Sequence, residues 1–278
     1  MISKPKIGVS DSLTGLQVGL PQDDNFLQSL LGKGYFSADT VAVDAAFTVP
    51  LPTPCFAYTT ADWPLKPDNL NGLIIDNDLT NSELTTRLPV ARHTPSGTTT
   101  QGEYAWLPLI DNGQLRDPVL RENFIICVTA LHELNNLRKQ TLTRHALIDF
   151  HSRYKLVLLA HDQPGYREIG PFVAAINEWQ DLEEFFVIYR KKLMNILQQP
   201  ASRENHVNAM MHIQGYFNRQ ITAEQRRELC DVIHNYRLGH LPINAPLTEL
   251  KRYLSKYPNG YLATQQYFKL YPNNWYLN

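Results

Sequence analysis

The chain has 278 residues, of which 43% are hydrophobic and 19% charged, and its 26 Lys+Arg and 27 Asp+Glu give a formal net charge of -1. The apolar fraction excludes a largely disordered chain, and the length allows one large domain or two ordinary ones with real cores. No apolar run reaches the roughly 20 residues that span a bilayer, and residues 1–6 lack the apolar stretch of a signal peptide. We therefore expect a cytoplasmic protein without a membrane segment.

Charge and cysteine usage narrow the function classes further. Residues 1–140 hold 10 Lys/Arg against 15 Asp/Glu (net -5), whereas residues 141–278 hold 16 against 12 (net +4) and seven of the nine histidines. This split favours an anionic partner for the C-terminal part, although halves of a neutral protein often differ by several charges. The three cysteines are far apart and unpaired in spacing, which excludes a disulfide framework and a self-contained metal knuckle.

The N-terminal part has the pattern of an α/β domain. Residues 6–10 predict a first strand, residues 25–31 have helical spacing, and residues 40–43 and 70–75 predict two more short strands. Five prolines between residues 50 and 67 predict a segment without regular structure. Strands separated by a helix indicate a small, mainly parallel sheet.

From about Asp117 onward the pattern is helical almost to the end of the chain. Capping and breaking residues delimit the later helices. We expect helices to begin after Asp181, Ser202 and Thr222 and near Pro246, and to end before Pro200, near Arg219 and at Gly239. The fold class is therefore an α/β domain over residues 1–140 followed by an all-α domain over residues 141–278.

A polar cluster falls on the predicted helix after Ser202. Asn208 and His212 are one turn apart, so both side chains point toward the same place. Beside Arg203 and His206, they fit the binding of a phosphate or a base edge, or proton transfer. A metal site fits less well, because His206 and His212 are six residues apart. The alternative is a half-buried helix whose histidines bond to the backbone or to neighbouring helices.

Two other segments combine cations with aromatic residues. In residues 150–168, His151 and Lys155 share one helical face, which fits either phosphate binding or an ordinary solvated surface. In residues 251–276, aromatic and basic residues alternate, which fits base stacking. The four-residue spacing of Tyr253 and Tyr257 also fits plain helix packing, the interpretation that we favour for this tail.

Short motifs in the C-terminal part occur in a recognisable order. They are Phe150-His151-Ser152-Arg153-Tyr154-Lys155-Leu156, Tyr166-Arg167-Glu168-Ile169-Gly170, Pro200-Ala201-Ser202-Arg203, Gly215-Tyr216-Phe217, Tyr236-Arg237-Leu238-Gly239 and Tyr261-Leu262-Ala263-Thr264-Gln265. In this order, over about residues 145–272, they resemble the YbgA-like helical domain.

The N-terminal part resembles a second domain. Residues 108–125 are similar to the end of a thiouracil desulfidase domain, and residues 6–10 to its opening strand. The chain as a whole thus resembles two-domain desulfidases that convert 4-thiouridine in transfer RNA back to uridine. The resemblance implies a 4Fe–4S cluster on three cysteines of the first domain, with one iron free to take the sulfur, and RNA recognition by the helical domain.

This sequence departs from that family at the cluster itself. The three cysteine positions correspond to Ser12, Asp44 and, after the strand at 70–75, Ser82, while the neighbouring catalytic carboxylate position is Ala46. Hydroxyls and a single carboxylate hold Fe–S clusters poorly. We therefore expect no cluster, no other metal and no catalytic residue, and a desulfidase scaffold that has lost its chemistry.

The sequence therefore predicts a non-catalytic relative of the transfer-RNA desulfidases whose helical domain binds transfer RNA or a nucleotide. Cations would hold phosphates, and Asn208 and the histidines would line the nucleotide pocket. The candidate contacts are Arg153, Lys155, Arg167, Arg203, His206, Asn208, His212 and Arg237. Two alternatives stay open: a cluster-independent enzyme that uses His206, Asn208 and His212, and a scaffold protein in near-UV or DNA-repair physiology.

Overall fold

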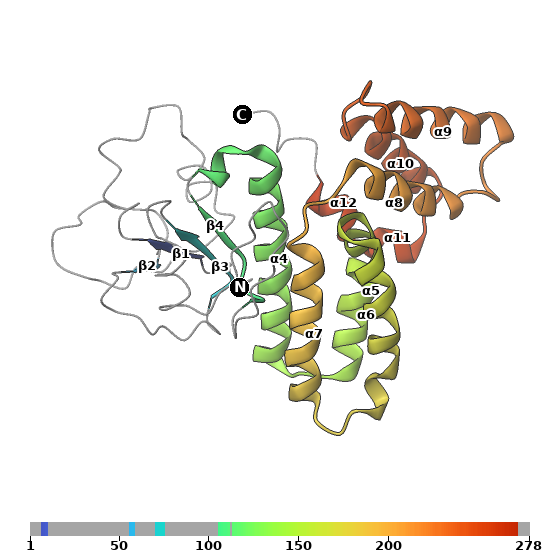
Figure 1. Cartoon of the computed structure of the whole chain (residues 1–278). Helices are drawn as coiled ribbons and strands as arrows, with labels where there is room; N and C mark the ends of the chain where they lie inside the picture. Colours follow the sequence, from blue (N-terminus) through green and yellow to red (C-terminus); the bar gives the residue numbers. More distant parts are fainter. Residues whose placement is uncertain (1–6, 11–55, 59–69, 76–104, 112, 272–278) are drawn as a thin grey trace. The chain divides into compact units, whose positions relative to one another are not determined.

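The computed structural model describes residues 7–10, 56–58, 70–75, 105–111 and 113–271 (Figure 1). The chain divides into two compact units, Met1–Asn136 and Leu137–Asn278. Several sequence-based predictions lie outside the described residues: the helix at 25–31, the strand at 40–43, and the three degenerate cluster positions Ser12, Asp44 and Ser82.

Four short strands form a parallel sheet in the first unit. In the order β2-β1-β3-β4, β2 (Phe56–Tyr58) pairs with β1 (Ile7–Ser10), β1 with β3 (Gly72–Ile75), and β3 with β4 (Leu109–Asp111). A parallel sheet with strands at 6–10 and 70–75 was predicted and is confirmed. β2 corrects the prediction that residues 50–67 lack regular structure. The prolines flank this strand and do not lie within it, so its backbone N–H groups stay available for pairing.

One face of β3 is covered by α4 (Pro118–Gln140) at a very short separation. A Cβ atom on Gly72 would lie 2.6 Å from Val128 Cγ2 and 2.9 Å from Phe124 Cζ. Phe124 and Val128 are both buried, and Asn71 Oδ1 lies 3.2 Å from His132 Nδ1 one turn further along α4. The absence of a side chain at residue 72 therefore allows the helix to pack against the strand.

The second unit is helical in its described residues. It contains α5 (Arg144–His161), α6 (Gln163–Ala174), the short 3-10 helix η4 (Ala175–Glu178), α7 (Leu182–Leu197), α8 (Arg203–Gly215), α9 (Ala223–Arg237), α10 (Asn244–Lys256), α11 (Gly260–Thr264) and α12 (Tyr267–Leu270). The central helix is α5, which packs against α6, α7 and α8, while α9 and α10 pack against α8 and each other (Figure 1). In the first unit, the 3-10 helix η3 (Gln114–Arg116) precedes α4.

The predicted helix caps are confirmed at their hydrogen bonds. Asp181 Oδ1 accepts from the backbone N–H of Glu183 at 2.8 Å, and Ser202 Oγ accepts from that of Asn205 at 3.1 Å. Thr222 forms a reciprocal capping box, and the φ angle of +83° at Gly239 terminates the turn after α9.

Two predicted helix boundaries need correction. α8 ends at Gly215, before the predicted end near Arg219, because the next N–H groups bond three residues back and tighten the chain into turns. α10 begins at Asn244, two residues before Pro246, and a proline is tolerated there because the first turn of a helix needs no N–H partner at that position.

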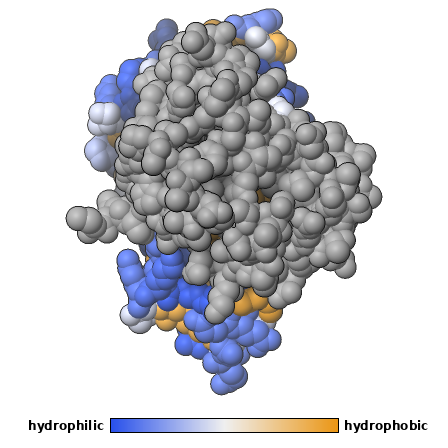
Figure 2. All heavy atoms as spheres, turned by 90° about the vertical axis from the view of Figure 1, so that its left-hand side faces the viewer, coloured by the Kyte–Doolittle hydropathy of each residue, from blue (hydrophilic) through white to orange (hydrophobic). Residues whose placement is uncertain are grey.

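The visible surface of the described residues is mostly polar. On the face seen in Figure 2, the described residues that are visible are mostly hydrophilic, with small hydrophobic groups between them. None of the helices in the described ranges is both long enough and apolar enough to cross a membrane.

Candidate functional site

The predicted polar cluster on α8 separates into two faces of the helix. With about 100° per residue, Asn208 and His212 lie about 40° apart, whereas His206 lies about 160° from Asn208. His212 is exposed and Asn208 half-buried, but His206 is only 5% exposed. The three side chains therefore do not converge, and the enzyme hypothesis that needs them together gains no support from this geometry.

His206 belongs to the interior of the second unit. Its Nδ1 lies 2.9 Å from the hydroxyl of Tyr267, and its ring packs edge-on against Tyr271 with centroids 4.7 Å apart. Burial, reinforced by the charges of His161 and Arg203, lowers the pKa of His206 to about 3. The residue is therefore a neutral core histidine, which removes it from the predicted set of RNA contacts.

A second interior histidine links α5 to the end of the described chain. His161 Nδ1 lies 2.7 Å from the carbonyl oxygen of Gln199, and Nε2 lies 3.1 Å from the hydroxyl of Tyr271. Because a carbonyl only accepts, Nδ1 carries the proton and Nε2 accepts from the tyrosine. Burial lowers the pKa of His161 to about 4, although the bond to Gln199 partly opposes this shift.

A third buried histidine follows the same pattern. His151 Nδ1 lies 3.2 Å from the hydroxyl of Tyr189 on α7. Burial, and then the charge of Lys155, lowers the pKa of His151 to about 4. Each of the three imidazoles therefore pairs with a tyrosine hydroxyl, and each acts as an uncharged hydrogen-bonding group between helices.

The predicted helix-packing role of the aromatic tail is confirmed for Tyr253, Tyr267 and Tyr271, which are all at most 3% exposed.

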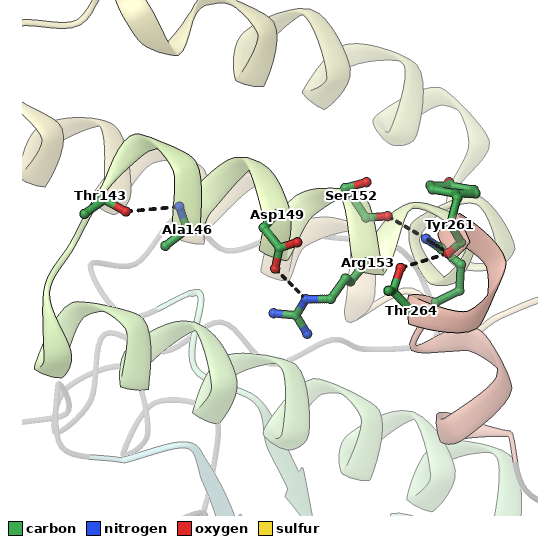
Figure 3. Close-up of polar contacts among 8 residues, drawn as sticks. Thr143, Ala146, Asp149, Ser152, Arg153, Tyr261 and Thr264 are labelled. Atoms are coloured by element: carbon green, nitrogen blue, oxygen red, sulfur yellow. Dashed lines mark hydrogen bonds and ion pairs between the residues drawn. The ribbon is translucent and has the colours of Figure 1, made fainter. Parts of the chain in front are cut away.

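The predicted cationic residues differ in whether their side chains already form contacts within the protein. The guanidinium of Arg203 lies 4.6 Å from the ring centroid of Tyr236 and donates to the carbonyl of the same residue. Arg153 forms an ion pair with Asp149 at 2.9 Å, drawn in Figure 3, and Lys155 is half-buried. Arg167 and Arg237 are exposed, and neither forms an ion pair with any residue that the structure describes.

Polar contacts along α5 fix the position of α11 (Figure 3). Thr143 Oγ1 accepts from the N–H of Ala146 at 3.1 Å, which caps α5. The Nε2 atom of the fully buried Gln265 donates to the carbonyl of Ser152 at 2.9 Å. Thr264 Oγ1 donates to the carbonyl of Tyr261 at 2.8 Å. This contact between α5 and α11 places Tyr261 beside the exposed end of α8.

Sequence reasoning missed the aromatic partners at that end. The rings of Tyr216 and Tyr261 are stacked, with centroids 5.4 Å apart and 23° between their planes. Tyr166 is close enough that, after burial, Tyr216 raises the pKa of the Tyr166 hydroxyl and Tyr166 contributes to raising that of Tyr261. The four-residue spacing from Asn208 through His212 to Tyr216 was a signal that could have found Tyr216. Its pairing with Tyr261 was not predictable, because 45 residues separate the two along the chain.

The described cysteines do not form a metal site. Cys127 is buried in α4, where burial raises the pKa of its thiol, and the Cys230 Sγ atom lies 3.1 Å from Gln214 Nε2. Within the described ranges, no three His, Cys, Asp or Glu side chains lie close enough together to hold a metal ion.

Comparison with known proteins defines the class of the helical unit. Residues 155–272 match the family described as "Protein of unknown function (DUF1722)". Among individual proteins, the "Uncharacterized protein YbgA" of Escherichia coli (strain K12) is 46% identical over 151 residues, which is 54% of this chain and 89% of that protein. The chain therefore belongs to the YbgA-like family. No solved structure matches it.

Proposed function

We propose that this chain is a non-catalytic relative of the transfer-RNA 4-thiouridine desulfidases, and that its helical unit binds an RNA strand or a nucleotide. The observation that carries this proposal is the exposed face of α8. It presents Asn208 and His212 one turn apart, and guanidinium groups without carboxylate partners among the described residues lie on α6 and on α9, which packs against α8.

The chemistry of these side chains suits a nucleotide. An amide donates and accepts at once, as a base edge requires, while guanidinium groups hold phosphate oxygens in two-pronged contacts. Arg167 and Arg237 are exposed for this role, and Arg203 presents a charge that its contact with Tyr236 holds in place. The net charge of +4 over residues 141–278 adds a general attraction for an anion.

The non-catalytic part of the proposal rests on the ligands at the cluster positions. Ser12, Asp44 and Ser82 offer no thiolate, the thiol of Cys127 is buried, and the half-buried thiol of Cys230 hydrogen-bonds to Gln214. These residues do not fit a 4Fe–4S cluster. Anaerobic reconstitution with iron and sulfide should yield no protein-bound visible absorbance, and a coloured preparation that removes sulfur from thiolated RNA would contradict this part.

RNA binding is tested by its dependence on salt. Fluorescence anisotropy with labelled transfer RNA should show affinity that falls as salt rises, because bound counterions are released. Replacing Arg167 and Arg237 by Gln should reduce the slope of log affinity against log salt by about 1.4, at about 0.7 for each lost phosphate contact on a single strand.

A charge-matched control separates a specific surface from general attraction. The double variant Lys191→Gln/Lys256→Gln removes the same charge from exposed positions on α7 and α10. It should leave the slope nearly unchanged. Binding that ignores salt, or an equal loss in both double variants, would contradict a contact surface along α6, α8 and α9.

A further inference from the structure

The tyrosines at the end of α8 form an aromatic cluster at the surface. Tyr216 stacks on Tyr261 and is 44% exposed, while Tyr166 and Tyr261 are half-buried. We call these three residues the tyrosine cluster. They come from three different elements: Tyr166 from α6, Tyr216 from the C-terminal cap of α8, and Tyr261 from α11.

Each member of the tyrosine cluster is held by its own backbone contacts. The N–H of Tyr216 bonds to the carbonyl of Ile213 at 3.1 Å and that of Tyr166 to the carbonyl of Asp162 at 2.9 Å. Tyr261 lies in α11, which Asn259 caps, and its carbonyl accepts from Thr264 Oγ1 at 2.8 Å. The backbone of each tyrosine is therefore fixed, and the rings of Tyr216 and Tyr261 already contact each other without a ligand, which reduces the entropy that binding must overcome.

Its exposure distinguishes Tyr216 from the buried tyrosines of the unit. Tyr253 and Tyr267 are 1% and 0% exposed, as expected for rings that stabilise the interior. Tyr216 instead keeps nearly half of its surface in water while one ring face rests on Tyr261. An exposed aromatic face backed by a second ring is a surface on which a flat ligand gains contact area.

The neighbouring polar groups indicate which flat ligand fits. His212 lies one turn before Tyr216 and Asn208 one turn before His212, so an amide and an imidazole follow the aromatic face along α8. Burial, and then the proximity of Tyr216, raises the pKa of the Tyr166 and Tyr261 hydroxyls, so both remain protonated and able to donate. The exposed cation Arg167 directly follows Tyr166.

We propose that the tyrosine cluster is a stacking subsite for one unpaired base, which packs on Tyr216 while His212 and Asn208 contact its edge. The subsite rests on the proposed function and makes it more specific, because it selects single-stranded over duplex RNA. Bases inside a duplex are already stacked on both faces and cannot reach a protein ring. Arg167 holds the phosphate of the same or the adjacent nucleotide.

The test replaces Tyr216 by an aromatic or an aliphatic side chain and compares the RNA affinity of the variants. The probe is a short single-stranded RNA that contains one 2-aminopurine, whose fluorescence is quenched when the base stacks, with a duplex RNA of the same length as comparison. Tyr216→Phe keeps the ring and should bind the single strand within about two-fold of wild type. Tyr216→Leu should bind it about ten-fold more weakly or worse and lose the quenching, while its salt slope stays unchanged because no charge is removed.

Two further variants keep the test decisive. Leu238→Ala alters another exposed apolar side chain, at the C-terminal cap of α9, and should bind as wild type does. Tyr216→Trp enlarges the aromatic face and should strengthen both binding and quenching, so the inference does not depend on the Leu variant alone.

The outcomes separate this inference from the proposed function. Salt-dependent binding that Tyr216→Leu leaves unaltered, or a preference for the duplex, would overturn the stacking subsite and leave the proposed RNA binding intact. Failure of the wild-type chain to bind either RNA would overturn both.

Discussion

Acidification should unfold the helical unit because its interior histidines are held neutral. His151, His161 and His206 have pKa values lowered to about 4, about 4 and about 3, and all three are at most 5% exposed. In the unfolded chain each imidazole returns to a pKa of about 6.5. The stability that these neutral rings contribute is therefore complete above about pH 6.5 and is lost as the pH falls toward their folded pKa values.

The expected loss is large compared with the stability of a domain. At pH 5 the unfolded chain has taken up nearly one proton on each of these imidazoles and the folded chain almost none, which costs about 2 kcal/mol for each histidine. Three histidines give about 6 kcal/mol, against a typical total free energy of unfolding of about 5–15 kcal/mol. Protonating the histidines within the folded state is also unfavourable, because Lys155 and Arg203 would repel the imidazolium groups of His151 and His206.

Urea unfolding of the full chain, followed by far-UV circular dichroism, measures this slope. Between pH 6.5 and 5.5 most carboxylates remain ionised, and the free energy of unfolding should fall by about 3 kcal/mol, at about 1 for each histidine, because the unfolded imidazoles are already half protonated at pH 6.5. His206→Gln should lower the slope by about one third. The matched control His212→Gln changes an exposed imidazole on the same helix and should leave the slope unchanged.

The reasoning would be refuted by a chain whose stability is the same at pH 7.5 and pH 5. It would equally be refuted if His206→Gln and His212→Gln changed the slope by the same amount, because burial would then not decide which histidine resists protonation.

Two further predictions concern packing and capping. Gly72→Ala should lower the free energy of unfolding by about 1–3 kcal/mol, because its Cβ would lie 2.6 Å from Val128, whereas Gly170→Ala, which meets no atom within 4 Å, should be neutral or raise it by about 0.5–1 kcal/mol. Denaturant titrations of both variants check this, and equal effects would contradict the close approach of α4 to β3. Thr222→Ala should cost about 1 kcal/mol by removing the capping box of α9, and Thr222→Ser should restore most of it. Loss of the same stability in both variants would show that the hydroxyl cap is not the cause.

Local chemistry explains which helix boundaries were predictable. Asp181, Ser202 and Thr222 each bond to N–H groups two or three residues away, so their effect is complete within one turn and is readable from the sequence. The strands β2 and β4 were not predicted, because three residues carry too little pattern and their pairing partners are distant in the chain. The prolines near β2 instead predicted a segment without regular structure.

At the candidate site, the sequence by itself determined that Asn208 and His212 share a helix face, because one turn of helix relates them regardless of the rest of the fold. Only the tertiary structure decided that His206 points inward to Tyr267, 61 residues further along, and that Tyr216 meets Tyr261 at the surface. Helical periodicity fixes which residues lie on the same side of a helix. Which side becomes the interior depends on the long-range packing of α8 between α5, α9 and α10, and no local pattern contains that information.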